Sequence, residues 1–167
     1  MATSKAEYGL GRKQLMNRRK QKEKIKTNMG INEIELIRGI CEDSFFEFLV
    51  EFRSSIFPEE PVWNWHIEKI CEECQSLIDR IVAKKKRKHD LLINVPPGST
   101  KSTIVSVALP VFAMVKMPSF RTIVGTHTFN PLGLNLSRLS RNIMKSEKFM
   151  DVWPNIRLSE DQDTKGY

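Results

Sequence analysis

Apolar residues recur at helical spacing over two stretches in the first half of the chain. From Asn32 to about Phe52, and again from Trp65 to about Lys84, apolar side chains return every three or four positions. This spacing gathers them on one face of an α-helix, so it predicts two amphipathic helices. The segment Phe57-Pro58-Glu59-Glu60-Pro61 separates them, because proline interrupts helical hydrogen bonding.

The pattern changes at residue 90. Asp90 to Val95 is a short apolar run that predicts a buried strand, and Lys101 to Val115 predicts a helix. Pro110 lies inside that helix and should kink or divide it, because proline lacks the backbone donor. Arg121 to Thr126 is short and rich in β-branched residues, which predicts a second buried strand. A further helix is predicted from Leu132 to Lys145.

The turn between the first predicted strand and its helix carries the candidate chemistry. Its sequence, Asn94-Val95-Pro96-Pro97-Gly98-Ser99-Thr100-Lys101-Ser102-Thr103, ends in Lys-Ser at the expected helix start. Backbone amides at such a turn point toward an anion, and the helix dipole favours negative charge there. We therefore expect the phosphates of a nucleotide, with its Mg²⁺, to bind at this turn.

Each residue of the turn has an expected role. Backbone amides of Gly98, Ser99 and Thr100 would face the phosphates, and Lys101 would add its charge as the candidate catalytic residue. Ser102 would ligate Mg²⁺ through the nucleotide, and Thr103 would support it from the helix start. The common phosphate-loop pattern has glycine where Thr100 stands, so an ordinary strand-to-helix turn that happens to carry a lysine is the alternative.

A strand, a helix and a strand in succession form a βαβ unit with parallel pairing and a right-handed crossover. The expected fold class is therefore α/β, with an incomplete parallel sheet of the P-loop NTPase type preceded by N-terminal helices. Three regions are expected. They are a basic leader at 1–30, predicted to be disordered, a helical region at 31–89, and a truncated P-loop ATPase core at 90–167.

Composition places the whole basic excess at one end. The chain has 167 residues and a net charge of +7, the size of one globular domain. Residues 1–26 hold nine Lys/Arg and two Asp/Glu, which leaves eighteen residues of each sign in the rest. Such a segment is either a solvated leader or an arm that contacts nucleic acid. No stretch approaches the roughly 20 apolar residues of a membrane span.

Other candidate features favour plainer interpretations. Cys71 and Cys74 have a metal-like spacing, but no second pair follows, so buried thiols on one helix face are preferred to zinc. The basic run at 84–88 predicts an exposed connection. Glu160, Asp161 and Asp163 follow a segment too polar for a buried strand, so they are rejected as the acidic Mg²⁺ site of an ATPase.

From Trp63 onward the chain resembles the large terminase subunit of tailed bacteriophages, the ATP-driven motor that packages DNA into the capsid. The order and spacing of several segments carry the resemblance, and Thr100 departs from the family's usual glycine. The matching segments are Trp63-Asn64-Trp65-His66, the turn from Leu91 to Ser102, Ile123 to Thr128, the pair Ser137 and Arg141, and Val152 to Gln162.

The resemblance implies ATP and Mg²⁺ as cofactors, bound by Pro97 to Thr103. It places Trp65 and His66 against the adenine, core packing and a surface imidazole being the alternative. It implies that Arg141, with Arg138 one turn before it, reaches phosphates or DNA, a solvated helix face being the alternative. The implied partners are double-stranded viral DNA, the portal protein, the small terminase subunit and further copies in a ring, with no membrane. The implied location is the host cytoplasm, transiently at the portal vertex of the procapsid.

The resemblance covers only the front part of such a motor. A complete large terminase also has an acidic ATPase strand, a coupling region and a nuclease, so either this chain is a fragment or a second polypeptide completes it. We therefore expect the chain alone to hydrolyse ATP poorly or not at all. Two alternatives remain, namely another P-loop ATPase of helicase-like type, and a non-catalytic DNA-binding or assembly protein.

Overall fold

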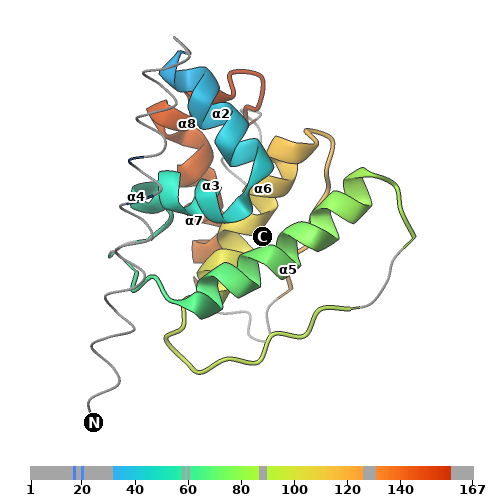
Figure 1. Cartoon of the computed structure of the whole chain (residues 1–167). Coiled ribbons are helices and arrows are strands. Elements are labelled where there is room, and N and C mark those ends of the chain that lie inside the picture. The colour runs from blue at the N-terminus through green and yellow to red at the C-terminus, as the bar shows by residue number, and fades with distance from the viewer. Residues whose placement is uncertain are drawn as a thin grey trace.

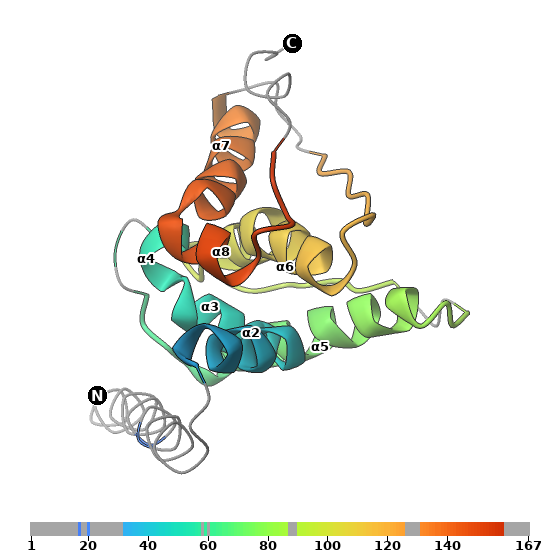
Figure 2. The same ribbon diagram turned by 90° about the horizontal axis from the view of Figure 1, so that it is seen from above.

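The computed structural model describes residues 17, 20, 32–57, 59, 61–86, 90–125 and 131–158. Within them the chain is helical and no strand is formed (Figures 1 and 2). The prediction of a P-loop-type parallel sheet is therefore wrong for this structure. Most of the predicted leader at 1–30, the end of the second predicted strand at 126, and the acidic residues at 160, 161 and 163 lie outside the described residues.

The two predicted strands are the source of the error. Residues 90–95 and 121–125 have no regular secondary structure, and no backbone hydrogen bond between described residues pairs either segment with another strand. A strand needs a neighbour to satisfy its amides and carbonyls, and the described part of the chain supplies none to either segment. Two of the apolar residues expected inside a sheet are exposed, with Leu92 91% and Ile123 99% accessible.

The first amphipathic stretch forms two helices in place of one. They are α2 (Glu33–Asp43) and α3 (Phe45–Glu51), followed by the short α4 (Arg53–Ile56). Ser44 separates α2 from α3 with an extended backbone, and its hydroxyl accepts a hydrogen bond from the amide of Glu47 at 3.3 Å. A serine in this role satisfies one of the unpaired amides at a helix start.

The remaining predicted helices are confirmed. The second amphipathic stretch is α5 (Trp65–Val82), and the stretch before Lys145 is α7 (Pro131–Lys145), followed by α8 (Glu147–Val152). The predicted division at Pro110 is also found. A π-helical segment η1 (Thr103–Ala108) gives way there to α6 (Leu109–Lys116), since proline cannot donate the regular helical hydrogen bond.

One hydrophobic cluster joins residues from both sides of position 90. Helix α5 packs against α3 and α6, and α7 packs against η1, α4 and α8. Figure 1 shows α5 crossing the molecule diagonally, and Figure 2 shows α2 and α3 on the side of α6 that faces away from α7. The largest fully buried side chains include Phe45, Phe48, Phe52, Phe112, Phe149, Ile67, Ile104 and Ile143.

Candidate functional site

The turn before η1 has an unusual backbone. Gly98 has φ +80° and Thr100 has φ +58°, so two residues separated by Ser99 adopt left-handed conformations. Glycine tolerates this region, but for a β-branched residue such as Thr100 it is strained, on the order of 1–3 kcal/mol. Side chains hold the turn, because Ser99 Oγ donates to the Pro96 carbonyl at 2.7 Å and Thr100 Oγ1 donates to the Ser99 carbonyl at 2.7 Å.

This backbone brings amides together at a helix start. The Ile104 amide donates to the Thr100 carbonyl at 3.0 Å and closes the first helical turn. The amides of the residues before Ile104 belong to that first turn and have no acceptor within the helix. Alternating left- and right-handed residues followed by a helix start form a concavity that suits an anion.

The Lys101 side chain folds back over the turn. Its ammonium Nζ donates to the Val95 carbonyl at 3.2 Å, and the residue is half-buried. A lysine at a helix start is repelled by the helix dipole unless negative charge lies nearby. The Val95 carbonyl supplies negative partial charge instead, so the position of Lys101 is explained without a ligand.

The other residues predicted to bind the nucleotide lie in the same turn, as expected for neighbours in the sequence. Pro97, Gly98 and Ser102 are exposed, while Ser99, Thr100 and Thr103 are half-buried. The exposed Ser102 is open to solvent at the helix start. Among the described residues no group of three or more His, Cys, Asp or Glu could hold a metal ion.

His66 and Trp65 lie at the start of α5. Trp65 is 76% exposed, and the His66 ring meets it edge-on at a centroid distance of 6.3 Å. Figure 1 places the start of α5 at the same end of the molecule as the chain that enters η1. The described ring contact of His66 is with Trp65, and its place against an adenine stays a prediction.

Arg138 and Arg141 lie on α7. Arg138 is exposed, and Arg141 donates from Nη2 to the Ser137 hydroxyl at 3.2 Å. The matched Ser137 and Arg141 are therefore neighbours along one helix face. Neither arginine has a described contact with the turn, and a solvated helix face accounts for both.

The cysteines are buried thiols, as expected. Cys71 and Cys74 are each 1% exposed and lie on the inner face of α5. Burial raises the pKa of the Cys71 thiol far above its ordinary range, and burial raises the pKa of Cys74 to about 11. Both thiols are neutral near pH 7 in the absence of a metal, so they are unsuited to nucleophilic chemistry.

The sequence-based interpretation overlooked a polar hollow on the second half of α5. Its lining mixes acidic, basic and amide side chains, so no single ligand charge is favoured. Polar residues recurring every three or four positions along α5 were the available signal. The hollow lies beyond the middle of α5, away from the helix start near the turn, and it is lined by Glu72, Gln75, Ser76, Asp79, Arg80 and Lys85.

No helix in the described part of the chain is long and apolar enough to cross a membrane. Comparison of the chain with protein-family models, with curated proteins and with solved structures finds no match in any of the three.

Proposed function

We propose that the turn from Pro97 to Thr103 binds the phosphates of Mg-ATP. The observation that supports this most is the pair of left-handed residues, Gly98 and Thr100, directly before a helix start. Strained backbone persists only where the surroundings hold it in place, and it is often found at ligand sites. Because no sheet is formed by the described residues, the proposal depends on this local arrangement and not on the fold.

Lys101 is placed to exchange one oxygen partner for another. Its ammonium bonds a neutral carbonyl at 3.2 Å, and a phosphate oxygen would give a charge-assisted bond, which is shorter and stronger. The adjacent Ser102 hydroxyl would complete the Mg²⁺ shell of the nucleotide. His66 would contact the adenine if the base of the bound nucleotide extends to the start of α5.

For the protein as a whole, we propose that the chain is the N-terminal part of an ATP-driven DNA-packaging motor of the large-terminase type. The resemblance from Trp63 onward supports this, and so does the nucleotide turn. Double-stranded DNA, the portal protein, the small terminase subunit and a homo-oligomeric ring then follow as proposed partners, with action in the host cytoplasm at the procapsid portal. ATP turnover near 1 s⁻¹ or above by the chain alone would contradict its expected inactivity.

The nucleotide site is tested by calorimetry with Mg-ATP on the parent chain and on Lys101→Met. We expect the variant to raise the dissociation constant about tenfold or more, since a charge-assisted bond of about 1.4 kcal/mol or more is removed. Lys69→Met removes one cation from the exposed side of α5, where Lys69 pairs with Glu72 and Glu73, and should bind like the parent. Equal binding by the parent and Lys101→Met, or none by the parent, would refute the site.

A non-catalytic DNA-binding or assembly role is the second candidate. It is favoured by the basic excess confined to residues 1–26. A helicase-like ATPase would have the same nucleotide-binding turn, but it would act on a different nucleic-acid substrate from a packaging motor. DNA binding without nucleotide binding would select the non-catalytic role.

A further inference from the structure

The last turn of α5 ends in a cluster of cations on a well-defined backbone. The Lys84 amide donates to the Ile81 carbonyl at 2.9 Å, and the Lys85 amide donates to the Arg80 carbonyl at 2.9 Å. This pair of bonds closes the helix end in a Schellman motif, so both carbonyls are already bonded. Arg80 Nη2 also donates to the Lys86 carbonyl at 2.7 Å. Figures 1 and 2 show this end of α5 at the outer edge of the molecule, and the three lysines are exposed.

Lys84 occupies the position at which a helix of this kind normally ends in glycine. Its φ of +51° lies in the left-handed region, which glycine adopts freely and lysine adopts at a cost in stability. Packing does not account for the lysine, because the residue is exposed. A strained and exposed lysine is accounted for if its charge serves to bind a ligand.

The polar hollow beside this helix end has positive charge that the protein does not neutralise. By composition its lining favours neither sign, but its two acids are already paired with lysines outside the lining, at 3.2 Å for Glu72 and 3.0 Å for Asp79. Arg80 and Lys85 also line the hollow, and neither is paired with an acid in the part of the chain that the structure describes. An anion can therefore bind there without displacing an internal ion pair.

The shape of the hollow and the charges around it select a small anion of high charge. The segment from Arg80 to Lys86 contains four cations and no acid, and the hollow has a volume of about 480 Å³, in the range of small-molecule sites. A flat membrane surface does not enter a hollow. A long nucleic acid lying along α5 would also meet the acids at Glu68, Glu72 and Glu73, whereas a small anion can lie at the basic end alone. Phosphate oxygens accept charge-assisted bonds from both arginine and lysine.

We propose that the hollow at the end of α5 binds a small ligand that carries several phosphate groups. Arg80 and Lys85 donate to phosphate oxygens in the hollow, and Lys84 adds its charge from the adjacent position. No residue of the turn from Pro97 to Thr103 lines the hollow, so this inference does not rest on the proposed nucleotide site.

The test titrates the full chain with inorganic tripolyphosphate in calorimetry, without Mg²⁺, and measures the Tm with and without the anion. We expect the parent to bind and its Tm to rise, because a ligand that binds only the folded state stabilises it. Lys85→Met should bind about tenfold or more weakly, since a charge-assisted bond is removed. Lys145→Met is the matched control, because it removes the same charge from the end of α7, and it should bind like the parent.

Lys84→Gly separates binding from folding. Glycine fits the left-handed position, so the Tm of the free variant should rise while its affinity for tripolyphosphate falls. No binding by the parent, or equal binding by the parent and Lys85→Met, would overturn the proposal. Binding that Lys101→Met abolishes and Lys85→Met leaves unchanged would place the anion at the turn instead. A glutamate peptide or duplex DNA that displaces tripolyphosphate at an equal concentration of negative charge would also overturn it, in favour of an acidic protein or a nucleic acid.

Discussion

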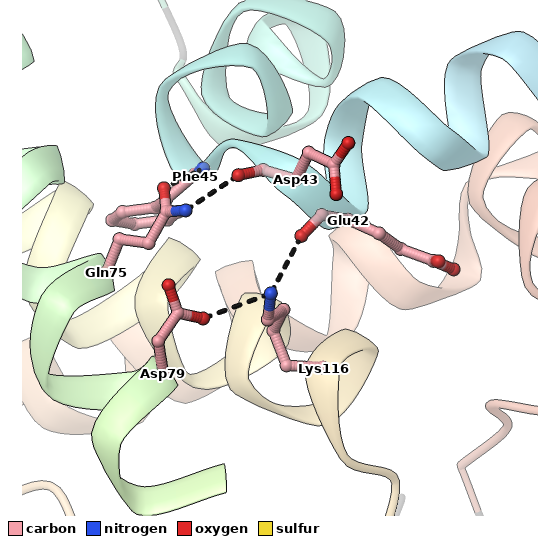
Figure 3. Close-up of polar contacts among 6 residues, drawn as sticks. All are labelled: Glu42, Asp43, Phe45, Gln75, Asp79 and Lys116. Atoms are coloured by element: carbon pink, nitrogen blue, oxygen red, sulfur yellow. Dashed lines mark hydrogen bonds and ion pairs between the residues drawn. The ribbon is translucent and has the colours of Figure 1, made fainter. Parts of the chain in front are cut away.

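Gln75 is the residue that joins two helix ends to a third helix. Its amide Nε2 donates to the Asp43 carbonyl at 2.7 Å, and its Oε1 accepts from the Phe45 amide at 2.8 Å (Figure 3). The two backbone groups lie on either side of the break at Ser44, where helical bonding is interrupted. One side chain of α5 thus replaces bonds that a continuous helix would have made.

Replacing Gln75 with methionine should destabilise the fold. Methionine keeps the length and removes both hydrogen bonds, so we expect the free energy of unfolding to fall by about 1–2 kcal/mol. Urea unfolding followed by circular dichroism measures the change. The control is Ser76→Ala at the adjacent exposed position, which should change the free energy of unfolding by no more than about 0.5 kcal/mol. An equally small change for Gln75→Met would show that the two hydrogen bonds of Gln75 do not stabilise the fold.

Lys116 completes the same junction from α6. Its ammonium donates to the Glu42 carbonyl at 3.1 Å and pairs with the Asp79 carboxylate at 3.0 Å. Figure 3 shows both bonds beside the bridge made by Gln75. These partners are separated by dozens of positions in the sequence, so no local pattern could have predicted them.

At the scale of elements, aromatic rings join α3, α6 and α8. Phe48 is fully buried, with ring centroids 5.1 Å from Phe52, 5.9 Å from Phe112 and 6.0 Å from Trp153. Further bonds hold α8 in place, since Arg38 donates to the Val152 carbonyl at 2.7 Å and Trp153 donates to Glu42 at 2.9 Å. The C-terminal end of α8 is therefore tied to α2 as well as to the ring cluster.

Phe48→Ala should be strongly destabilising. Removing a fully buried ring leaves a cavity, so we expect the free energy of unfolding to fall by about 3–5 kcal/mol, measured by denaturant unfolding. Trp65→Ala is the matched control, since it removes a larger ring that is 76% exposed and should change stability far less. Similar decreases in both variants would be inconsistent with this packing.

The helices were predictable and the strands were not, for a physical reason. A helix satisfies its own backbone, so the apolar periodicity of α5 and α7 was sufficient to predict them. Segments 90–95 and 121–125 have strand-like composition, but their state is decided by a neighbour that the sequence does not specify. The break at Ser44 had a signal that was overlooked, since Ser44 and Glu47 have the spacing of a capping box.

The candidate site was predictable only in part. Adjacency in the sequence was enough to place residues 97–103 in one turn, with a helix beginning at Lys101. The left-handed Thr100 and the bond from Lys101 to Val95 were not predictable, because both depend on how the turn closes on itself. The expected contact of His66 with the adenine stays a prediction, since it depends on a spatial relation between α5 and the turn that the sequence does not specify.

At the scale of the whole molecule, charge is distributed unequally. The basic excess belongs to residues 1–26, while the rest of the chain has equal numbers of acids and bases. Among the described residues, the buried cluster is formed by residues from Cys41 to Trp153. The basic excess and this cluster thus lie in different parts of the sequence.

Deleting residues 1–26 should weaken DNA binding and its dependence on salt. Each DNA phosphate that the leader neutralises adds about 0.9 to the steepness of log affinity against log salt, so the deletion should flatten the plot markedly. Fluorescence titration of duplex DNA at increasing salt measures this. Replacing Lys69 by methionine in the full chain serves as a control for charge outside the leader, and an unchanged slope after the deletion would exclude DNA binding by residues 1–26.

The Val95 carbonyl competes with any incoming anion for the Lys101 ammonium. An anion arriving at the site meets an ammonium that already donates one of its three N–H groups to an internal oxygen, so the two acceptors compete for the same cation. The measured affinity then depends on how much stronger the bond to the anion is than the bond to the carbonyl. A small heat of binding would therefore not measure the strength of the bond between Lys101 and the anion. Selectivity would depend on how much more negative charge the anion carries than a peptide oxygen.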